Sequence, residues 1–434
     1  GGKKNYVEIS SCMFKFTVNF LALTDAISLK ITLHDQKSVE AIWQNFLLIF
    51  SCSNEEESVI ELHQQNSSEI REKVNALVDE FKYDLPQLKT LSAYFRKLKE
   101  SEHFYFLPNL KLDQKEIQKL YFNLRAIDKR IDFNETEMQF DDLFGDLFKN
   151  YHLKTVGPKR IYIGEKDKEK RVCRFCQNKS KPLTFRNKAH GISEALGNKT
   201  VVLLEECDEC NDKFSKTIEP DIIQYLALFR IFYDVKGKGG SKKFKGDNFE
   251  IKNDGNVELK FYSADDLLLI HDKVKLDGKE TISLQNIYRS LCKFFLSVID
   301  SEHLPAFTDT IKWINHDLEV AQLPKMGQLI SYHGFTKQPK LVTYRRKTDD
   351  INIPYAVGEF YFTCVVIVFI LPFTTKDEKD FTSESDYEYF WDTFQHSKRT
   401  DGWEFIDFSN DTKKKSTINI NFSSPQSHSK RTLS

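Results

Sequence analysis

The chain has 434 residues, of which 40% are hydrophobic and 29% are charged, and its formal net charge is −1. This composition is typical of a globular protein with more than one apolar core, and it excludes collagen-like and low-complexity chains. It also excludes a chain that is basic throughout, so affinity for an anionic partner would have to come from a local cluster of charge.

The cysteines and the apolar segments indicate the compartment. Four of the eight cysteines, Cys12, Cys52, Cys292 and Cys364, are scattered without shared spacing, which argues against a disulfide framework. The chain opens with Gly-Gly-Lys-Lys, without a secretory signal. Its longest apolar run, 360–373, is too short for a membrane helix and predicts a buried strand. We therefore expect a cytoplasmic protein.

The first region, residues 1–150, is predicted to be mainly helical. It begins with a strand-like alternation of Phe14, Phe16, Val18 and Phe20. Apolar residues at helical spacing then predict a helix over 68–81, with Ser68 as its N-cap, and another over 113–127. These stripes indicate a core, and we expect this region to serve regulation or assembly.

Charge is distributed unevenly in the second region, residues 151–255. Residues 151–190 contain twelve Lys or Arg against three acidic residues, whereas 191–234 contain four basic and nine acidic ones. A glycine-containing loop with five lysines follows at 236–245. Such basic segments can follow a phosphate backbone, although the loop could equally be a solvated surface hairpin.

Two Cys-x-x-Cys pairs stand out in the same region. Cys173 and Cys176 precede Cys207 and Cys210 by about thirty residues, the spacing of a four-thiolate zinc site. His190 lies between the pairs, and Asn211 directly follows the last cysteine. A zinc ion with four cysteine ligands has no open position, so it would be structural, and any catalytic metal would be a second ion.

The remainder is predicted to form a mixed α+β domain over 256–408 and a disordered tail over 409–434. Apolar residues at helical spacing predict helices over 218–233 and 283–299. The tail is rich in Ser and Lys. The whole chain is thus expected to be an α+β multidomain protein, with a mainly helical region before the cysteine motif and a mixed one after it.

The cysteine motif resembles the zinc-containing branch of the HNH endonucleases. The resemblance covers about residues 171–250, on Cys173-Arg-Phe-Cys176, the His190 segment through Asn198, and Cys207-Asp-Glu-Cys210-Asn211. It implies a ββα-metal module in which a hairpin carries the catalytic histidine and the next helix carries a metal ligand. It also implies hydrolysis of phosphodiester bonds, with double-stranded DNA as the expected substrate and RNA as a second one.

By this resemblance, His190 is the general base, Asn211 a ligand of catalytic Mg²⁺ or Mn²⁺, and Asn198 the residue that orients the hairpin. An imidazole suits the first role because it can remove a proton from water near neutral pH. Many members of the family have a metal ligand directly before the base, where this chain has Ala189. Another ligand is therefore expected, either Glu194, which could instead cap a helix or form a salt bridge, or Asp212.

Phosphate contacts are expected from basic residues of the second region, namely Arg171, Arg174, Arg186, Lys236, Lys238, Lys242, Lys243 and Lys245. Analogy with stand-alone HNH proteins suggests a role in bacterial defence against phage or other foreign DNA, with a partner such as an ATPase or sensor subunit. Two alternatives stay open. One is a zinc knuckle that binds nucleic acid without cutting it, with His190 merely packed; the other is a structural subunit of a larger complex.

Overall fold

The computed structural model describes residues 14–33, 36–54, 57–60, 62–108, 112–176, 183–237, 243–262, 273–331 and 336–421. The chain divides into two compact units, Gly1–Gly145 and Asp146–Ser434. Both contain helices and small sheets, so the expected α+β class is confirmed. Within the described ranges, we find no helix with the length and apolar character needed to cross a membrane.

The first unit is built on a four-stranded antiparallel sheet with the strand order β2-β1-β6-β5. Its elements are β1 (Phe14–Ala22), β2 (Ala26–Leu33), α1 (Gln36–Phe50), β3 (Ser51–Asn54), β4 (Glu57–Ile60), β5 (His63–Gln65), α2 (Ser68–Phe81), η1 (Pro86–Leu88), α3 (Lys89–Lys97), β6 (His103–Pro108) and α4 (Gln114–Asp128). Helices α1, α2 and α3 share one core with the sheet. The next helix, α5 (Phe133–Asn150), includes the point at which the two units are divided.

Local sequence signals predict this unit well at the level of single elements. The expected strand is β1, and the expected helices are α2 and α4. The N-cap of α2 is Ser67 and not Ser68, because the Ser67 hydroxyl accepts the hydrogen bond from Ile70 N. The region also contains more strands than expected, because β5 and β6 carry no strong alternation of polar and apolar residues. They complete the sheet through pairing, β6 with β1 and β5 with β6.

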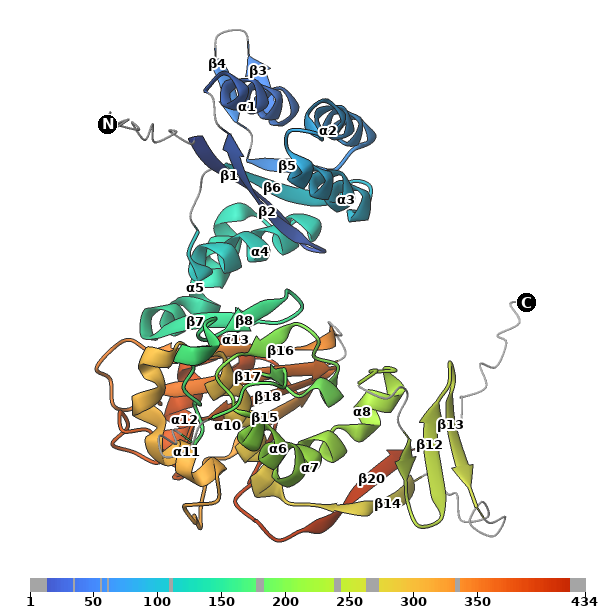
Figure 1. Cartoon of the computed structure of the whole chain (residues 1–434), viewed down its shortest axis with the longest axis vertical. Helices are drawn as coiled ribbons and strands as arrows, with labels where there is room; N and C mark the ends of the chain where they lie inside the picture. Colours follow the sequence, from blue (N-terminus) through green and yellow to red (C-terminus); the bar gives the residue numbers. More distant parts are fainter. Residues whose placement is uncertain are drawn as a thin grey trace, which may run out of the picture. The chain divides into compact units, whose positions relative to one another are not determined.

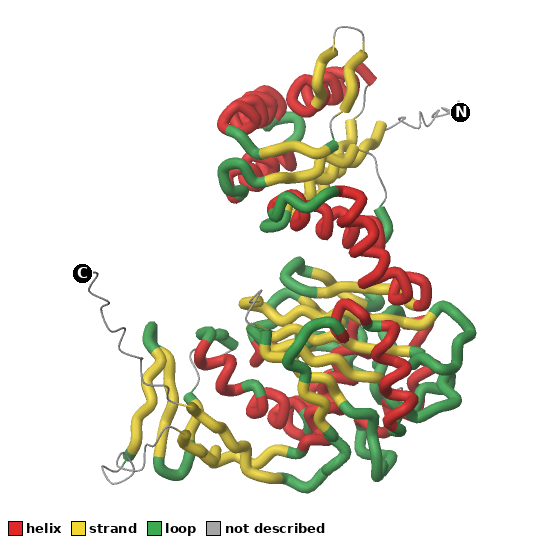
Figure 2. Tube along the Cα trace, turned by 180° about the vertical axis from the view of Figure 1, so that it is seen from behind, coloured by secondary structure: helices red, strands yellow, loops and turns green. Residues whose placement is uncertain are grey.

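The second unit is organised around a six-stranded antiparallel sheet with the order β19-β15-β18-β17-β16-β7 (Figures 1 and 2). The apolar run at 360–373 begins in β17, continues through β18 and ends just after it. Cys364 connects the two strands, and Thr363, the last residue of β17, has a φ of 51°. The elements are β7 (Tyr151–Val156), β8 (Ile161–Ile163), η2 (Lys168–Lys170), β9 (Ala189–His190), η3 (Glu194–Leu196), β10 (Val201–Leu203), α6 (Asp208–Thr217), α7 (Glu219–Tyr225), α8 (Ala227–Phe232), β11 (Phe244–Lys245), β12 (Phe249–Asn253), β13 (Val257–Phe261), β14 (Lys273–Ile282), α10 (Leu284–Val298), η4 (Ser301–Phe307), α11 (Thr308–Ile314), β15 (Met326–Ile330), β16 (Thr336–Arg346), β17 (Ala356–Thr363), β18 (Val365–Ile370), α12 (Glu384–Thr393), α13 (Gln395–Lys398), β19 (Glu404–Ile406) and β20 (Lys414–Asn421).

Helix α10 lies at the centre of this unit. Every residue from Gln285 to Val298 is buried, including its charged residues. One side of α10 contacts the large sheet, where the Tyr288 hydroxyl donates to Ile370 O at 2.6 Å. Another side contacts α7, through the bond from Asn286 Nδ2 to the Asp221 carboxylate at 2.8 Å. A helix buried all round must satisfy each of its polar groups within the protein, which ties α10 to several segments at once.

The cysteine-containing region and the region after it are not separate in the structure. One apolar core includes Cys173, Phe214 and Ile222 from the first and Phe295 and Phe360 from the second. The boundary expected near residue 255 therefore crosses a shared core, because α10 supplies one wall for both regions. The boundary expected near residue 150 is close to the division after Gly145.

A second, smaller group of strands follows α8. Strands β11, β12 and β13 form an antiparallel sheet, and β14 pairs with β20. Strand β20 lies within the segment 409–434, which was expected to be a disordered tail. Its residues pair with β14 from Lys273 to Ile282, so this part of the segment belongs to a sheet. Residues 422–434 are outside the described residues. The helix expected over 218–233 is two helices, α7 and α8, which meet at Leu226.

Candidate functional site

Four cysteine thiols lie together where α6 begins. The Sγ atoms of Cys173, Cys176, Cys207 and Cys210 are all within 4.8 Å of one another, and those of Cys176 and Cys207 are 3.8 Å apart. A tetrahedral zinc ion with Zn–S bonds of about 2.3 Å needs sulfur atoms about 3.8 Å apart. The cluster could therefore hold a zinc ion, as the spacing predicts.

Backbone hydrogen bonds support the cluster. Cys207 is the N-cap of α6, and its Sγ accepts from Cys210 N at 3.5 Å. Cys173 Sγ accepts from Cys207 N at 3.4 Å. A hydrogen bond from the Cys210 thiol, together with backbone donors, lowers the pKa of Cys173 to about 5. Burial raises the pKa of Cys207 to about 12, and the hydrogen bond to Cys173 raises the pKa of Cys210 well above its usual range. Of these three thiols, only Cys173 is therefore held in the thiolate form that binds zinc.

Arg174, between the first two cysteines, is a structural residue. It is 2% exposed, and its guanidinium pairs with Glu205 at 2.9 Å. It also donates to Leu296 O and Ile299 O at 2.9 and 2.7 Å, which are carbonyls at the C-terminal end of α10. A cation there satisfies carbonyls that the helix leaves without partners. The phosphate contact expected of Arg174 is thus wrong, because the side chain is buried and already bonded.

A hairpin and a helix follow in the order strand, strand, helix. Strands β9 and β10 pair antiparallel with His190 opposite Val202, and α6 comes next along the chain. Asn198 is 1% exposed inside the turn. Its Nδ2 donates to Ile192 O and Val201 O, while its Oδ1 accepts from Thr200 N and Val201 N. These four bonds hold the turn between the two strands, and they place Asn198 as a support of the hairpin that carries His190.

His190 stands at the end of β9 with one face toward a pocket. Its side chain is 14% exposed, and its Nε2 lies 3.7 Å from the Glu194 carboxylate. Its Nδ1 is buried and has no hydrogen-bond partner among the described residues. Burial lowers the pKa of His190, although the negative charge of Glu194 acts in the opposite direction. The imidazole is therefore neutral at pH 7, with a free electron pair available to accept a proton.

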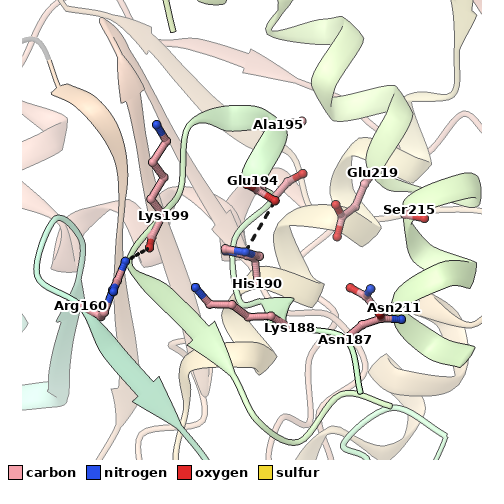
Figure 3. Close-up of a pocket in the computed structure, with 11 residues that line it drawn as sticks. Arg160, Asn187, Lys188, His190, Glu194, Ala195, Lys199, Asn211, Ser215 and Glu219 are labelled. Atoms are coloured by element: carbon pink, nitrogen blue, oxygen red, sulfur yellow. Dashed lines mark hydrogen bonds and ion pairs between the residues drawn. The ribbon is translucent and has the colours of Figure 1, made fainter. Parts of the chain in front are cut away.

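The pocket beside His190 has a volume of about 660 Å³. Figure 3 shows Arg160 and Lys199 on one side of His190 and Asn211, Ser215 and Glu219 on the other. Glu194 lies next to the His190 ring, and the Lys188 side chain passes the ring with its amine toward Arg160 and Lys199. Asn187, Ser193 and Ala195 complete the lining. The structure thus brings His190, Glu194 and Asn211 together around one cavity. Asp212, the alternative ligand, pairs instead with Lys216 at 2.7 Å on the outer face of α6.

Glu219, at the start of α7, is a pocket residue that sequence analysis does not single out. Its carboxylate accepts from Lys293 Nζ at 3.1 Å. Lys293 comes from α10, is 1% exposed, and also lies 3.1 Å from Glu206 and 3.4 Å from the His190 carbonyl oxygen. Burial lowers the pKa of Lys293, but attraction to Glu206 and Glu219 outweighs it and leaves the pKa raised. The charged ammonium therefore joins both strand β9 and helix α7 to the core.

Replacing Lys293 with Met is expected to destabilise the second unit by about 3–5 kcal/mol, because it leaves Glu206 and Glu219 without their counter-charge. Urea unfolding followed by tryptophan fluorescence measures the change, since three of the four tryptophans lie in this unit. Lys216→Met is the matched control: its pair with Asp212 is exposed, and about 0.3–0.5 kcal/mol is expected. Equal losses in the two variants would contradict the proposed role of burial.

The remaining basic residues expected to bind phosphate lie in different settings. Arg171 donates to the carbonyls of Glu165 and Lys166, and Arg186 is exposed. Three lysines of the loop have acidic partners: Lys236 with Asp234 at 3.3 Å, and Lys243 and Lys245 with Glu250 at 2.9 and 3.9 Å. Lys238 and Lys242 lie outside the described residues.

Comparison with protein-family models, with curated proteins and with solved structures finds no match for this chain. Any assignment of function must therefore come from the site itself. What the site offers is a neutral imidazole, carboxylate and amide oxygens, and three cationic side chains around one open pocket.

The acidic stretch of 191–234 was the one sequence signal that pointed toward Glu219. It contains nine acidic residues, and nothing local distinguishes Glu219 from the others. Arg160 and Lys199 lie 39 residues apart in sequence. Each precedes a strand, Arg160 β8 and Lys199 β10, and the parallel pairing of these two strands brings both residues to the pocket. Their proximity depends on strand pairing across the sheet and could not be predicted from spacing.

Proposed function

We propose that this protein is a metal-dependent endonuclease of the HNH type, which hydrolyses phosphodiester bonds of nucleic acid, double-stranded DNA foremost. One observation carries the proposal: His190 on the hairpin and Asn211 on the following helix line the same pocket, beside a four-cysteine cluster that could hold zinc. The ββα order of these elements supports it.

His190 supplies the general base. Hydrolysis requires removal of a proton from the attacking water, and Nε2 is the ring nitrogen on the pocket side. A lowered pKa keeps this nitrogen unprotonated at neutral pH. Asn198 fixes the turn of the hairpin, and Lys293 Nζ donates a hydrogen bond to the His190 carbonyl oxygen. These bonds hold the backbone of His190 so that its ring stays directed at the pocket.

Oxygen atoms suited to a divalent ion line the pocket beside His190. Asn211, Glu194 and Glu219 would hold Mg²⁺ or Mn²⁺, whose preferred ligands are carboxylate and amide oxygens. Such an ion would stabilise the negative charge that develops on the phosphate. In the described part of the chain, the cysteines are the one group of three or more His, Cys, Asp or Glu side chains close enough to bind an ion together. The catalytic ion would therefore keep several waters and a substrate oxygen as ligands, as Mg²⁺ commonly does.

Nicking of supercoiled plasmid is expected to need added Mg²⁺ or Mn²⁺ and to depend on pH through His190. Its base form must be neutral, so the rate rises about tenfold per pH unit in acid and levels off once pH exceeds the pKa. Because burial lowers this pKa from 6.5, the plateau begins below about pH 6.5 and includes neutral pH. Initial rates measured from pH 4.5 to 8.5 test this.

The control for that assay is zinc-loaded protein without Mg²⁺ or Mn²⁺, which should leave the plasmid intact. Binding of DNA without nicking under every metal condition would favour the non-catalytic zinc knuckle. A chain that neither binds nor nicks DNA would favour the structural subunit. A rate that still rises between pH 7.5 and 8.5 would assign the base to another group.

A further inference from the structure

Three cationic side chains line the His190 pocket from three separate segments. Arg160 precedes β8, Lys188 precedes β9, and Lys199 lies in the turn before β10. All three residues are exposed. Arg160 Nη2 donates to the Lys199 carbonyl oxygen at 3.5 Å, which links two of the segments. Figure 3 shows Arg160 and Lys199 on one side of His190, with the Lys188 amine directed toward that side. We call this group the basic rim.

The basic rim differs from the lysine loop in its partners. Among the residues that the structure describes, no carboxylate forms an ion pair with Arg160, Lys188 or Lys199. Each described lysine of the loop, by contrast, has an aspartate or glutamate within 4.0 Å. A cation that already has an anionic partner must give it up to bind phosphate, whereas a cation neutralised only by salt releases counterions and gains affinity.

The rim also has the right neighbours for a phosphodiester. The charged ends of Arg160, Lys188 and Lys199 lie on one side of His190, and the oxygen atoms of Asn211 and Glu219 lie on the other. Glu194 lies next to the ring itself. The side with carboxylates would attract a cation and repel phosphate, so the polyanionic strand has one favourable approach.

We propose that Arg160, Lys188 and Lys199 bind the backbone phosphates of the nucleic-acid strand that is cut, in place of Arg174 and the lysine loop. This inference rests on the proposed nuclease function and adds the binding site for the substrate. Contacts to phosphate carry no sequence information, so recognition by this rim is independent of sequence. The base composition of the bound strand should therefore have little effect on affinity at this site.

The test measures binding in the His190→Ala background, where cleavage does not interfere. Fluorescence anisotropy with a labelled DNA duplex, repeated at several salt concentrations, gives the slope of log K against log [salt]. Combining R160A, K188A and K199A removes three phosphate contacts, so the slope should become shallower by about 2.7. Affinity at 0.15 M salt should fall on the order of a hundredfold by the same relation.

The matched control combines K236A, K243A and K245A, which removes the same charge from lysines that have acidic partners. Its slope is expected to change by less than about 1. Zinc content and circular dichroism establish that both variants are folded. A control that loses as much slope as the rim variant, or a rim variant that binds like the parent, overturns the inference.

The inference and the nuclease proposal can fail separately. If the wild-type chain cleaves DNA and the rim variant binds it unchanged, the proposed phosphate site would be wrong and the nuclease proposal would stand. If the wild-type chain never cleaves and the rim variant still loses binding, the phosphate site would be supported and the nuclease proposal would be wrong. Equal weakening for duplex and single-stranded RNA of the same length would extend the site to RNA backbones.

Discussion

Replacing His190 with alanine is expected to lower the rate of plasmid nicking by about 10²–10⁴-fold, the usual contribution of a general base. The ring lies at the pocket wall and makes a contact of 3.7 Å with Glu194 and no hydrogen bond from Nδ1 to a described residue. Its removal should therefore change stability and DNA affinity little. Single-turnover nicking at saturating Mg²⁺ measures the loss.

His303→Ala is the matched control for this variant. His303 is 19% exposed, burial lowers its pKa, and its Nε2 lies 3.3 Å from Glu302, so its surroundings resemble those of His190. It does not line the His190 pocket. Nicking should persist in His303→Ala. If His190→Ala cleaved at the wild-type rate, the activity would come from another site or from a contaminating nuclease.

Replacing Cys207 with serine is expected to abolish bound zinc and to unfold the segment around α6. Apparent zinc affinities of structural sites correspond to about 10–16 kcal/mol, and folding of such knuckles is coupled to the metal. Cys207 is also the N-cap of α6, but serine is itself a good N-cap. The loss can therefore be assigned to the metal and not to the cap.

Two measurements follow this variant. Zinc per chain should fall from about one to near zero, and amide hydrogen exchange should rise across β9, β10 and α6. Nicking should disappear as well, because α6 carries Asn211 and lies beside the hairpin of His190. Cys292→Ala, which removes a buried thiol outside the cluster, should keep its zinc. A zinc-free Cys207→Ser chain with unchanged exchange and nicking would contradict the role of the cluster.

Contacts of Lys293 and Arg174 explain why the segment 151–255 needs the sequence that follows it. Lys293 reaches the hairpin and α7 from α10, 103 residues after His190. Arg174 reaches the end of the same helix from the cysteine loop. Helix α10 therefore supports both the candidate zinc cluster and the pocket, and the residues after 255 are part of the same folded core. Excision of residues 151–255 would remove that support.

Local signals were sufficient for much of this protein. The Cys-x-x-Cys spacing predicted a four-thiolate cluster, because two residues between ligands let both thiols face one ion. Helices α2, α4 and α10 were predicted from apolar periodicity, which acts within a few residues, although the N-cap of α2 is Ser67 and not the expected Ser68. His190, Glu194 and Asn211 were predicted as site residues from the motif, and the structure places them around one pocket.

The tertiary structure alone decided which charges are free and which are bonded. Arg174 and Arg160 both lie in the same basic stretch of sequence, yet one is buried in an ion pair and the other lines the pocket. Glu219 and Lys293 meet across 74 residues. The physical reason is that burial and ion pairing depend on contacts between distant segments, whereas sequence patterns record only the preferences of neighbouring residues. Sequence thus determined the elements and the cysteine cluster, and packing around α10 determined the electrostatics of the site.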